Sequence, residues 1–218
     1  MKILILIPCY NTHSYIDDLI SQIKSYTNHD ILIYDDGSSP PIKKHTDCEN
    51  IYFLRNELNS GKGSTLFSGF EYAKDANYTH VITLDGDMQH SPKDINKFIS
   101  IDSSVEFVFG CRKFRKPMPI HRILSNTITS FIISILVNKK IKDTQCGYRR
   151  YKLSTLDITA IDNRGYLYET EILLKSISAK TSFKNLNIET IYSDSVSSIN
   201  NIKDTFRFIK VIMRHVFA

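Results

Sequence analysis

Short aliphatic runs that each end at polar or acidic residues constrain this sequence more than any other feature. Lys2–Ile7 is aliphatic after its lysine and meets Pro8, and Asp30–Tyr34 stops at two further aspartates. The run over Thr79–Leu84 ends at Asp85-Gly86-Asp87. Continuous apolar runs of this length are typical of strands buried on both faces of a parallel sheet. The sequence therefore predicts an α/β fold with polar groups at the carboxyl ends of its strands.

The segments between and after these runs alternate between helical and extended patterns. Ser14 can cap a helix that reaches Tyr26, and Ser91-Pro92 suits the first turn of another helix. The alternation indicates a right-handed, mostly parallel central sheet flanked by helices. Further strands are predicted over 50–54, 105–110 and 183–192, a turn and strand over 143–151, and further helices over 61–76, 120–137, 166–178 and 202–217.

The composition argues against several classes of protein. The 218 residues suffice for one substantial domain, and no long linker divides them. A formal charge of +5 is too mild to indicate nucleic acid, although it suits anionic substrates or an anionic membrane surface. The four cysteines form no Cys-x-x-Cys pair, which argues against a zinc site and favours a reducing, cytoplasmic location. No apolar run approaches the ~20 residues that span a bilayer.

The Asp85-Gly86-Asp87 triplet is the first candidate for chemistry. Such a triplet alone is more often a solvated turn than a site. At the tip of a buried strand, however, two carboxylates need a partner, because an unpaired buried carboxylate is costly. Oxygen-only ligation suits Mg²⁺ or Mn²⁺, and such an ion usually completes its shell with water and substrate phosphates. Gly86 lets the backbone approach a ligand, since it has no Cβ.

Two other strand ends supply polar groups to the same place, because ligands bind at the carboxyl ends of strands in open parallel sheets. Pro8-Cys9-Tyr10-Asn11 follows the first strand and Asp35-Asp36 the second. A carboxylate after the second strand can accept hydrogen bonds from a nucleobase or a ribose. Lys62 and Arg112 can neutralise phosphates. Three polar strand ends in this order indicate a nucleotide site rather than three unrelated turns.

Six short motifs follow one another along the chain: Pro8-Cys9-Tyr10-Asn11, Asp35-Asp36-Gly37-Ser38, Gly61-Lys62-Gly63, Asp85-Gly86-Asp87-Met88-Gln89-His90, Asp143–Arg149 and Tyr168–Glu171. In this order and spacing, the first four resemble inverting family-2 glycosyltransferases with the GT-A fold. The last two are similar to the branch that contains dolichyl-phosphate mannose synthase and bacterial polyprenyl-phosphate glycosyltransferases. Each motif is weak alone, but the combination is specific and covers nearly the whole chain.

This resemblance implies a UDP- or GDP-sugar donor and a divalent metal, Mg²⁺ or Mn²⁺. It implies a single domain over 1–218, with a nucleotide-sugar-binding half over 1–118 and an acceptor-side half over 119–218. Asp87 is implied to ligate the metal, and Asp85 to share the ion or support the ribose. The residues expected to bind the donor are Pro8, Tyr10, Asn11, Asp36, Lys62, Asp85, Gly86, Gln89 and Arg112.

The reaction that the resemblance implies is a single displacement at the anomeric carbon, with inversion. A sugar hydroxyl acceptor would need a base, for which Asp143 is the first candidate and Glu171 the second. A polyprenyl phosphate would attack without a strong base, because its second pKa, if about 6 as in other phosphomonoesters, leaves it largely ionised at neutral pH. Arg149 is a candidate ligand for that phosphate. The acceptor stays open between a polyprenyl phosphate, a cell-surface glycan intermediate and a soluble saccharide.

The two longest helices of the second half are open to several interpretations. The helix over 202–217 could lie on the inner face of the plasma membrane, or it could pack its apolar stripe on the sheet. The helix over 120–137 could contact a membrane, contact a second copy in a homo-oligomer, or belong to the core. The stripes of the last helix are apolar (Ile202, Phe206, Ile209, Met213, Val216) and cationic (Lys203, Arg207, Lys210, Arg214).

Other functions fit the sequence less well. A non-catalytic nucleotide-sugar-binding subunit with a membrane-protein partner is the main alternative. The presence of Asp85, Asp87, Gln89 and Arg112 argues against a protein without catalytic activity. A P-loop is excluded at Gly61-Lys62-Gly63, because glycine follows the lysine where Ser or Thr is required. A dinucleotide-binding dehydrogenase would need Gly-x-Gly-x-x-Gly after the first strand. A sugar-nucleotide-forming nucleotidyltransferase would need a glycine-rich basic loop there.

Overall fold

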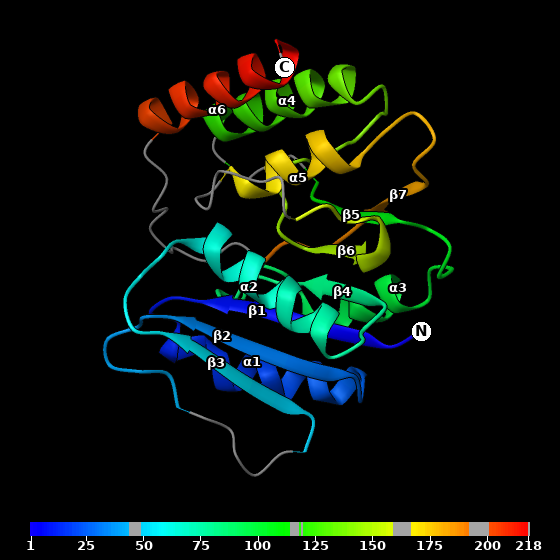
Figure 1. Ribbon diagram of the computed structural model, residues 1–218. Coiled ribbons are helices and arrows are strands. Elements are labelled where there is room, and N and C mark those ends of the chain that lie inside the picture. The colour runs from blue at the N-terminus through cyan, green and yellow to red at the C-terminus, as the bar shows by residue number, and fades with distance from the viewer. Residues whose placement is uncertain (44–48, 114–117, 119, 159–166, 192–200, 218) are drawn as a thin grey trace.

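The computed structural model describes residues 1–218 except 44–48, 114–117, 119, 159–166, 192–200 and 218, and apart from the side chains of 121 and 201–207 (Figure 1). The strands are β1 (Ile3–Cys9), β2 (Asp30–Asp36), β3 (Ile51–Asn56), β4 (His80–Thr83), β5 (Phe107–Cys111), β6 (Arg149–Lys152) and β7 (Phe183–Asn187). The helices are α1 (His13–Tyr26), α2 (Lys62–Asp75), α3 (Ile95–Ile99), α4 (Ile120–Leu136), α5 (Tyr168–Ser176) and α6 (Asn201–Val216), with 3-10 turns η1 (Pro92–Asp94) and η2 (Leu153–Thr155).

The strands form one sheet in the order β3-β2-β1-β4-β6-β5-β7 (Figure 1). β1 pairs in parallel with β2 and β4, and the β2–β3 and β5–β7 pairs are also parallel. β6 runs antiparallel to both of its neighbours, β4 and β5. The mostly parallel sheet expected from the sequence is confirmed. The reversed direction of β6 is a feature that a strand pattern alone cannot indicate.

The sheet is buried on both faces, as its central strand shows. Leu6 of β1 joins an apolar cluster with Phe70 of α2, whereas its neighbour Ile5 joins a second cluster with Leu19 of α1. Successive strand residues point to opposite faces, so an uninterrupted aliphatic strand can serve two cores at once. The helices α1 and α2 accordingly lie on opposite faces of the sheet (Figure 1).

The chain order reverses between β1 and β4, which is the place where ligands bind in open α/β sheets. Leu6 of β1 pairs with Thr83 of β4. Pro8 lies two residues further along β1 and Asp85 lies two residues beyond Thr83, so the two residues are next to each other. Asp35, near the end of β2, pairs with the last residue of β1. The polar ends of β1, β2 and β4 thus meet as expected, and we call this region the strand-end edge.

Most predicted boundaries differ from the structure by one or two residues, as at α1, and the end of β7 differs by more. α1 begins at His13, one residue before the predicted cap Ser14. β7 ends at Asn187 rather than at 192, because the chain then leaves the sheet to meet the loop after β4. Thr190 forms an antiparallel bridge with His90 of that loop. Residue 192 itself lies outside the described residues.

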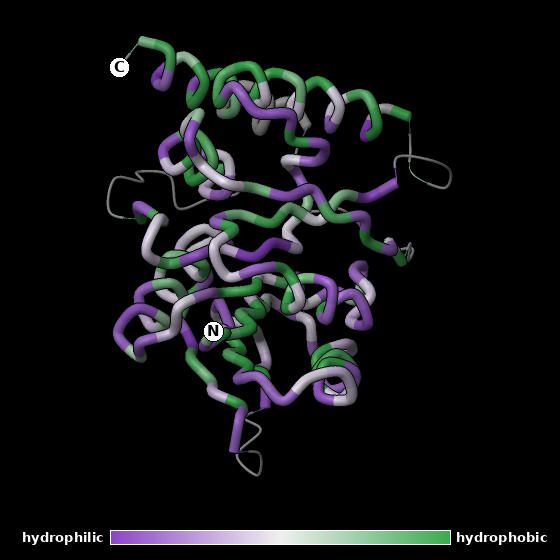
Figure 2. Tube along the Cα trace, turned by 90° about the vertical axis from the view of Figure 1, so that its right-hand side faces the viewer, coloured by the Kyte–Doolittle hydropathy of each residue, from purple (hydrophilic) through white to green (hydrophobic). Residues whose placement is uncertain are grey.

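α4 and α6 lie at one end of the molecule, far from β3, and both show hydrophobic stretches there (Figures 1 and 2). α6 does not pack with the predicted apolar stripe. Val211 is buried in the cluster beneath the helix, and Phe208 and Ile212 pack beside it. The described members of the stripe are instead about half exposed: Ile209 49%, Met213 51% and Val216 52%. For these residues, the interpretation that the stripe packs on the sheet is wrong.

None of the helices in the described part of the chain has both the length and the apolarity needed to cross a membrane.

Candidate active site

The loops after β1 and β2 hold each other in place. The Asn11 backbone N–H donates to Ser38 Oγ at 2.8 Å, and Ser39 N–H donates to Asn11 Oδ1 at 3.0 Å. Asn11 has a φ of 54°, which asparagine tolerates better than most residues. Tyr10, next to it, is 51% exposed, while Pro8 is partly buried at the end of β1. The paired loops therefore present an aromatic ring at the strand-end edge.

Asp35 is a structural carboxylate. It is fully buried and accepts hydrogen bonds from the N–H groups of Ser38 and Ile42 and from the Arg55 guanidinium. Burial alone would raise the pKa of Asp35, but these bonds, with those of Ser38 foremost, hold it below its usual range. Asp35 therefore fixes the loop that carries Ser38.

Asp36 orders the start of α2. Its Oδ1 accepts from Asn56 Nδ2 at 2.7 Å and from Ser60 N–H at 2.9 Å, and its Oδ2 accepts from Gly61 N–H at 2.8 Å. These bonds fix the residues directly before Lys62. The expectation that Asp36 lines a nucleoside pocket stays a prediction, and its internal bonds explain how the Gly61-Lys62-Gly63 motif is positioned.

Asp85 lies in a cationic setting. Its Oδ1 is 2.6 Å from Lys62 Nζ, and its Oδ2 is 3.5 Å from His90 Nε2. A Cβ added to Gly147 would lie 2.5 Å from Asp85 Oδ2, so only glycine leaves room for the carboxylate there. Burial would raise the pKa of Asp85, but Lys62 and then His90 lower it well below its usual range. Asp85 is therefore a carboxylate that the protein keeps ionised.

Asp87 differs from Asp85 although only Gly86 separates them. The turn through Met88, with a φ of 59°, lets Gln89 N–H donate to Asp87 Oδ1 at 3.0 Å. Burial and the neighbouring Asp85 charge raise the pKa of Asp87. A carboxylate that repels its neighbour in this way gains most from a bound cation.

The pair fits a hard divalent cation. Asp85 and Asp87 supply oxygen ligands, which Mg²⁺ and Mn²⁺ prefer. In the described ranges, no group of three or more His, Cys, Asp or Glu side chains is arranged to hold a metal. A two-carboxylate site suits an ion that takes its other ligands from water and substrate phosphates. Gly86 backs onto the first loop, because a Cβ there would lie 3.4 Å from Pro8 O.

Glu169 belongs to the site, and sequence reasoning missed it. Its Oε2 lies 3.1 Å from Lys62 Nζ, and its Oε1 lies 3.7 Å from Arg149 Nη1. Burial opposes the charge of Lys62, but Asp85 and Glu169 raise the pKa of Lys62 above its usual range. Glu171, the predicted second base, lines a hollow between α5 and α6 instead. The spacing indicates that only one of the two glutamates can face the site, but it cannot say which, because α5 is buried at successive positions.

Arg149 is an internal brace. It is 1% exposed and donates to Thr144 O at 2.6 Å, Cys146 O at 2.7 Å and Tyr151 Oη at 3.2 Å. The bonds to the two carbonyls shape the Asp143–Gly147 loop, which lies against Asp85. The expectation that Arg149 binds an acceptor phosphate remains a prediction. Its carbonyl contacts give it a different role in this structure, namely to hold the loop.

Arg112 and Asp143 form a two-pronged ion pair. Arg112 Nε donates to Asp143 Oδ2 at 2.7 Å and Nη2 donates to Oδ1 at 3.0 Å. The backbone N–H groups of Arg112 and Gln145 donate to the same carboxylate at 3.3 and 3.1 Å. Asp143 is 1% exposed and its partner 16%. This carboxylate therefore orients Arg112 at the end of β5.

Solved structures share the whole architecture. Glucosyl-3-phosphoglycerate synthase from Mycobacterium tuberculosis, crystallised with Mg²⁺ and UDP, superposes with a TM-score of 0.70 at 14% identity, over 98% of this chain and 79% of that one. Mannosyl-3-phosphoglycerate synthase from Rubrobacter xylanophilus gives 0.66 at 16% identity, over 99% and 72%. These neighbours confirm the predicted GT-A fold.

The sequence comparisons name the family. The UDP-N-acetylglucosamine–dolichyl-phosphate N-acetylglucosaminyltransferase of Methanococcus voltae is 29% identical over 97% of this chain and 95% of its own length. The polyprenol monophosphomannose synthase of Mycolicibacterium smegmatis is 21% identical over 81% and 72%. The family model described as Glycosyl transferase family 2 matches residues 4–157. This chain therefore belongs to glycosyl transferase family 2, and it is a glycosyltransferase.

Proposed function

We propose that this enzyme transfers a sugar, with inversion, from a UDP- or GDP-sugar to a polyprenyl phosphate, and that it uses Mg²⁺ or Mn²⁺. The observation that carries the proposal is the ion pair of Asp85 with Lys62, with Asp87 two residues further on, at the switch point between β1 and β4. Two relatives support the acceptor: the name of one gives dolichyl-phosphate as its acceptor, and the name of the other gives a polyprenol monophosphate sugar as its product. The M. tuberculosis neighbour, which binds UDP with Mg²⁺, supports the donor and the ion.

The metal would be held by Asp85 and Asp87, and when bound it would neutralise charge on the leaving nucleoside diphosphate. Lys62 already places one positive charge at Asp85. The remaining donor contacts come from residues that the structure holds in order. Tyr10 would stack on the base and Gln89 would face the diphosphate-sugar.

Arg112 would stabilise the same leaving group, and Asp143 would act by orienting it. The two hydrogen bonds between guanidinium and carboxylate fix the direction of the cation before the donor arrives. A preset positive charge costs no rearrangement during the reaction. Asp143 is thus assigned a positioning role instead of the role of a base.

The state of Asp143 also bears on the acceptor. Asp143 already accepts four hydrogen bonds, two of them from the Arg112 guanidinium, so both of its oxygens are engaged within the protein. A sugar hydroxyl would need a carboxylate oxygen that is available to take its proton, whereas a phosphate monoester reaches the site largely ionised. This difference favours a polyprenyl phosphate over a saccharide acceptor.

The test is a transfer assay with a panel of UDP- and GDP-sugars, a short-chain polyprenyl phosphate, and either Mg²⁺ or Mn²⁺. Asp87→Asn should lower metal-dependent transfer by roughly 10²- to 10³-fold, since a catalytic metal contributes several kcal/mol to stabilising charge. Asp18→Asn, on the exposed face of α1, removes the same charge away from the site and should leave transfer unchanged.

Three results would contradict the proposal. Full activity of Asp87→Asn would remove the metal assignment. Transfer to a soluble saccharide but not to polyprenyl phosphate would overturn the acceptor. Donor binding without either transfer or donor hydrolysis would favour the non-catalytic alternative.

A further inference from the structure

α4 leaves a full-length apolar stripe uncovered. At 3.6 residues per turn its five exposed apolar side chains fall within an arc of about 80°. The opposite side of the helix packs inward through buried Ile133, and Val137, directly after the helix, belongs to the same apolar cluster. The stripe consists of Ile120 (83% exposed), Leu124 (59%), Ile128 (49%), Phe131 (66%) and Ile135 (62%).

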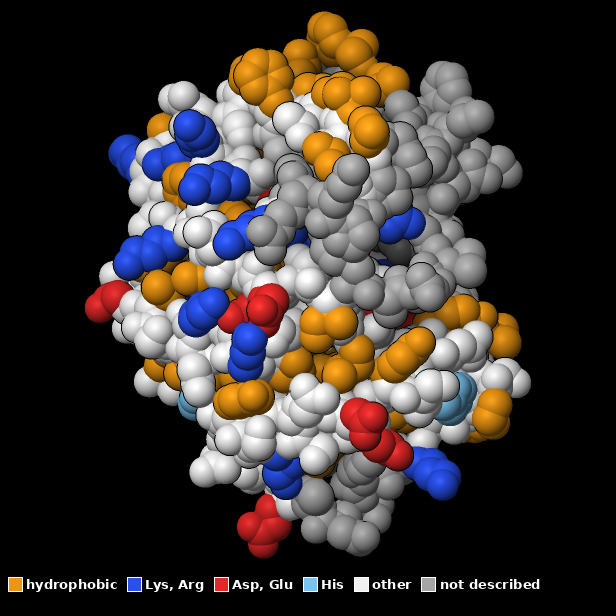
Figure 3. Space-filling model, turned by 180° about the vertical axis from the view of Figure 1, so that it is seen from behind, with side chains coloured by type: hydrophobic (Ala, Val, Ile, Leu, Met, Phe, Trp, Pro, Cys, Tyr) orange, Lys and Arg blue, Asp and Glu red, His pale blue; other side chains and the backbone are white. Residues whose placement is uncertain are grey.

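α6 adds a second apolar row at the same end of the molecule. Ile209, Met213 and Val216 are joined by Phe217, which is 77% exposed. Elsewhere in the described chain, the exposed large apolar residues are mostly tyrosines, whose hydroxyl groups suit water. Figure 3 shows hydrophobic side chains gathered over this end. We call the nine residues of the two rows the α4–α6 face. Exposed apolar side chains gathered at one end of a protein mark an interaction site.

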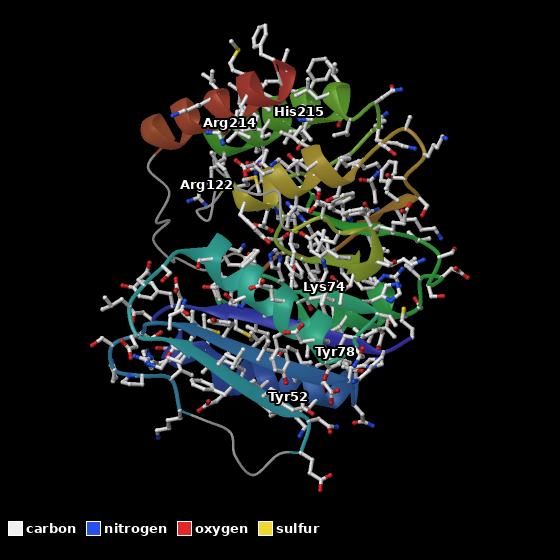
Figure 4. All side chains as sticks on the ribbon, viewed as in Figure 1. Tyr52, Lys74, Tyr78, Arg122, Arg214 and His215 are labelled. Carbon is white, nitrogen blue, oxygen red and sulfur yellow. The ribbon has the colours of Figure 1, made fainter. Side chains whose placement is uncertain are left out.

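The charges around this face decide what it contacts. The sequence has no Asp or Glu between Ile120 and Leu136 or between Phe208 and Phe217. Lys210 and Arg214 are exposed and, from their positions in the helix, border the apolar row of α6. Arg214 and His215 are marked on α6 in Figure 4.

A second copy docking face to face would bring cations toward cations. An anionic lipid surface would instead supply the opposite charge to Lys210 and Arg214 and accept the apolar rows. We therefore propose that the α4–α6 face docks on an anionic membrane surface, with the two helices lying in the headgroup region. This inference rests on the proposed function in one respect: docking would bring the enzyme to a lipid-phosphate acceptor.

α5 connects this face to the active site. Glu169, near its start, contacts Lys62 of the site. Leu173 and Leu174, on the same helix, belong to the apolar cluster that holds Ile133 of α4 and Val211 of α6. A docked α4–α6 face would thus place the acceptor side of the site close to the lipid surface, with no membrane-spanning helix required for contact.

The test is flotation of the full chain with vesicles of phosphatidylglycerol and phosphatidylcholine in equal parts, and with phosphatidylcholine alone. The wild type should float with the anionic vesicles. Leu124→Gln combined with Phe131→Gln should lower the bound fraction by roughly tenfold or more, because both apolar side chains are lost from the lipid contact. Lys210→Glu combined with Arg214→Glu should remove the preference for anionic vesicles.

The matched control is Tyr26→Gln combined with Leu58→Gln, which removes two exposed apolar side chains from another part of the surface and should float like the wild type. Failure of the wild type to float would overturn the inference. A stable dimer in solution that Leu124→Gln with Phe131→Gln dissociates would overturn it in favour of a second copy.

The proposed function can fail separately. Transfer to a short-chain, water-soluble polyprenyl phosphate does not need a membrane, so the α4–α6 variants should retain it. Absence of that transfer in the wild type, with flotation intact, would reject the acceptor and keep the docking surface.

Discussion

The strand-end edge and the α4–α6 face handle their side chains in opposite ways. At the edge, charges are matched within the protein: Lys62 lies between Asp85 and Glu169, and Arg112 binds Asp143. On the face, apolar side chains are about half exposed or more, and Lys210 and Arg214 border the row of α6. The charges at the edge are paired before any ligand binds. The apolar side chains of the face, in contrast, would be covered only by a binding partner. Substitutions at the edge should therefore alter stability or catalysis, and substitutions on the face should alter only binding to a membrane.

The strongest way to break the edge is Arg149→Met. This change removes the donor to two loop carbonyls and leaves Glu169 without its partner on that side. Breaking a buried charge network in this way costs about 3–5 kcal/mol. Urea unfolding followed by circular dichroism should show that loss, and Lys210→Met on exposed α6 should change stability by less than about 0.5 kcal/mol. Equal stability of the two variants would mean that Arg149 is not a brace.

A smaller change at the edge should damage catalysis more than folding. In Gly147→Ala the new Cβ would force the Asp85 carboxylate to move, because it would lie 2.5 Å from Oδ2. A displacement of about 1 Å at a reacting centre costs roughly 10²-fold in rate, so kcat/KM should fall by that amount.

Gly110→Ala is the matched control for this change. There the Cβ would meet the backbone oxygen of Tyr148 at 2.6 Å, and backbone cannot turn aside as a carboxylate can. Gly110→Ala should therefore lose more stability than Gly147→Ala, as measured by thermal unfolding. A Gly147→Ala enzyme with wild-type kcat/KM would show that the exact position of Asp85 does not matter.

The contrast between the two regions also explains what the sequence could predict. The aliphatic residues of β1 and the inward residues of α2, such as Leu66 and Phe70, follow from periodicity, because burial depends on their spacing along one element. The meeting of Pro8 with Asp85 follows from parallel strands sharing one edge. These features depend on local pattern and on a general rule of topology.

The side-chain partners could not be predicted in the same way. Arg149 and Asp143 were expected at the acceptor, yet each is engaged by groups that only the folded chain brings close, such as Arg112. Glu169, and not Glu171, lies beside Lys62 because of the rotation of α5 about its axis. The sequence does not indicate this rotation, because α5 has buried residues on nearly all sides. The exposure of the apolar row on α6 likewise depends on which side meets its neighbours.

The edge should also show a pH dependence that the face lacks. The pKa of Asp35 is lower in the folded protein than in the unfolded chain. Its contribution to stability is therefore complete above the unfolded value, about 3.9, and is lost as the pH falls through the folded value. Arg55→Met should cost about 1.5–3 kcal/mol at neutral pH, the range for a hydrogen bond to a charged group.

The measurement is urea unfolding of the wild type and Arg55→Met from neutral pH down to pH 3. The difference between them should narrow at the acid end, because protonated Asp35 no longer needs the guanidinium. A difference that stayed constant over this range would assign the effect of Arg55 to packing rather than to charge.

The smallest expected effect belongs to the face and tests whether it is free in solution. Ile133→Ala and Ile135→Ala make the same change on one helix, two residues apart, at side chains that are 0% and 62% exposed. The buried change should cost about 2–5 kcal/mol in unfolding free energy, and the exposed one less than about 0.5 kcal/mol. Helix propensity cancels between the two variants, so the gap measures burial alone. A loss of 2 kcal/mol or more in Ile135→Ala, growing with protein concentration, would mean that a second copy covers α4 in solution, and the contrast between edge and face would then hold only for the isolated chain.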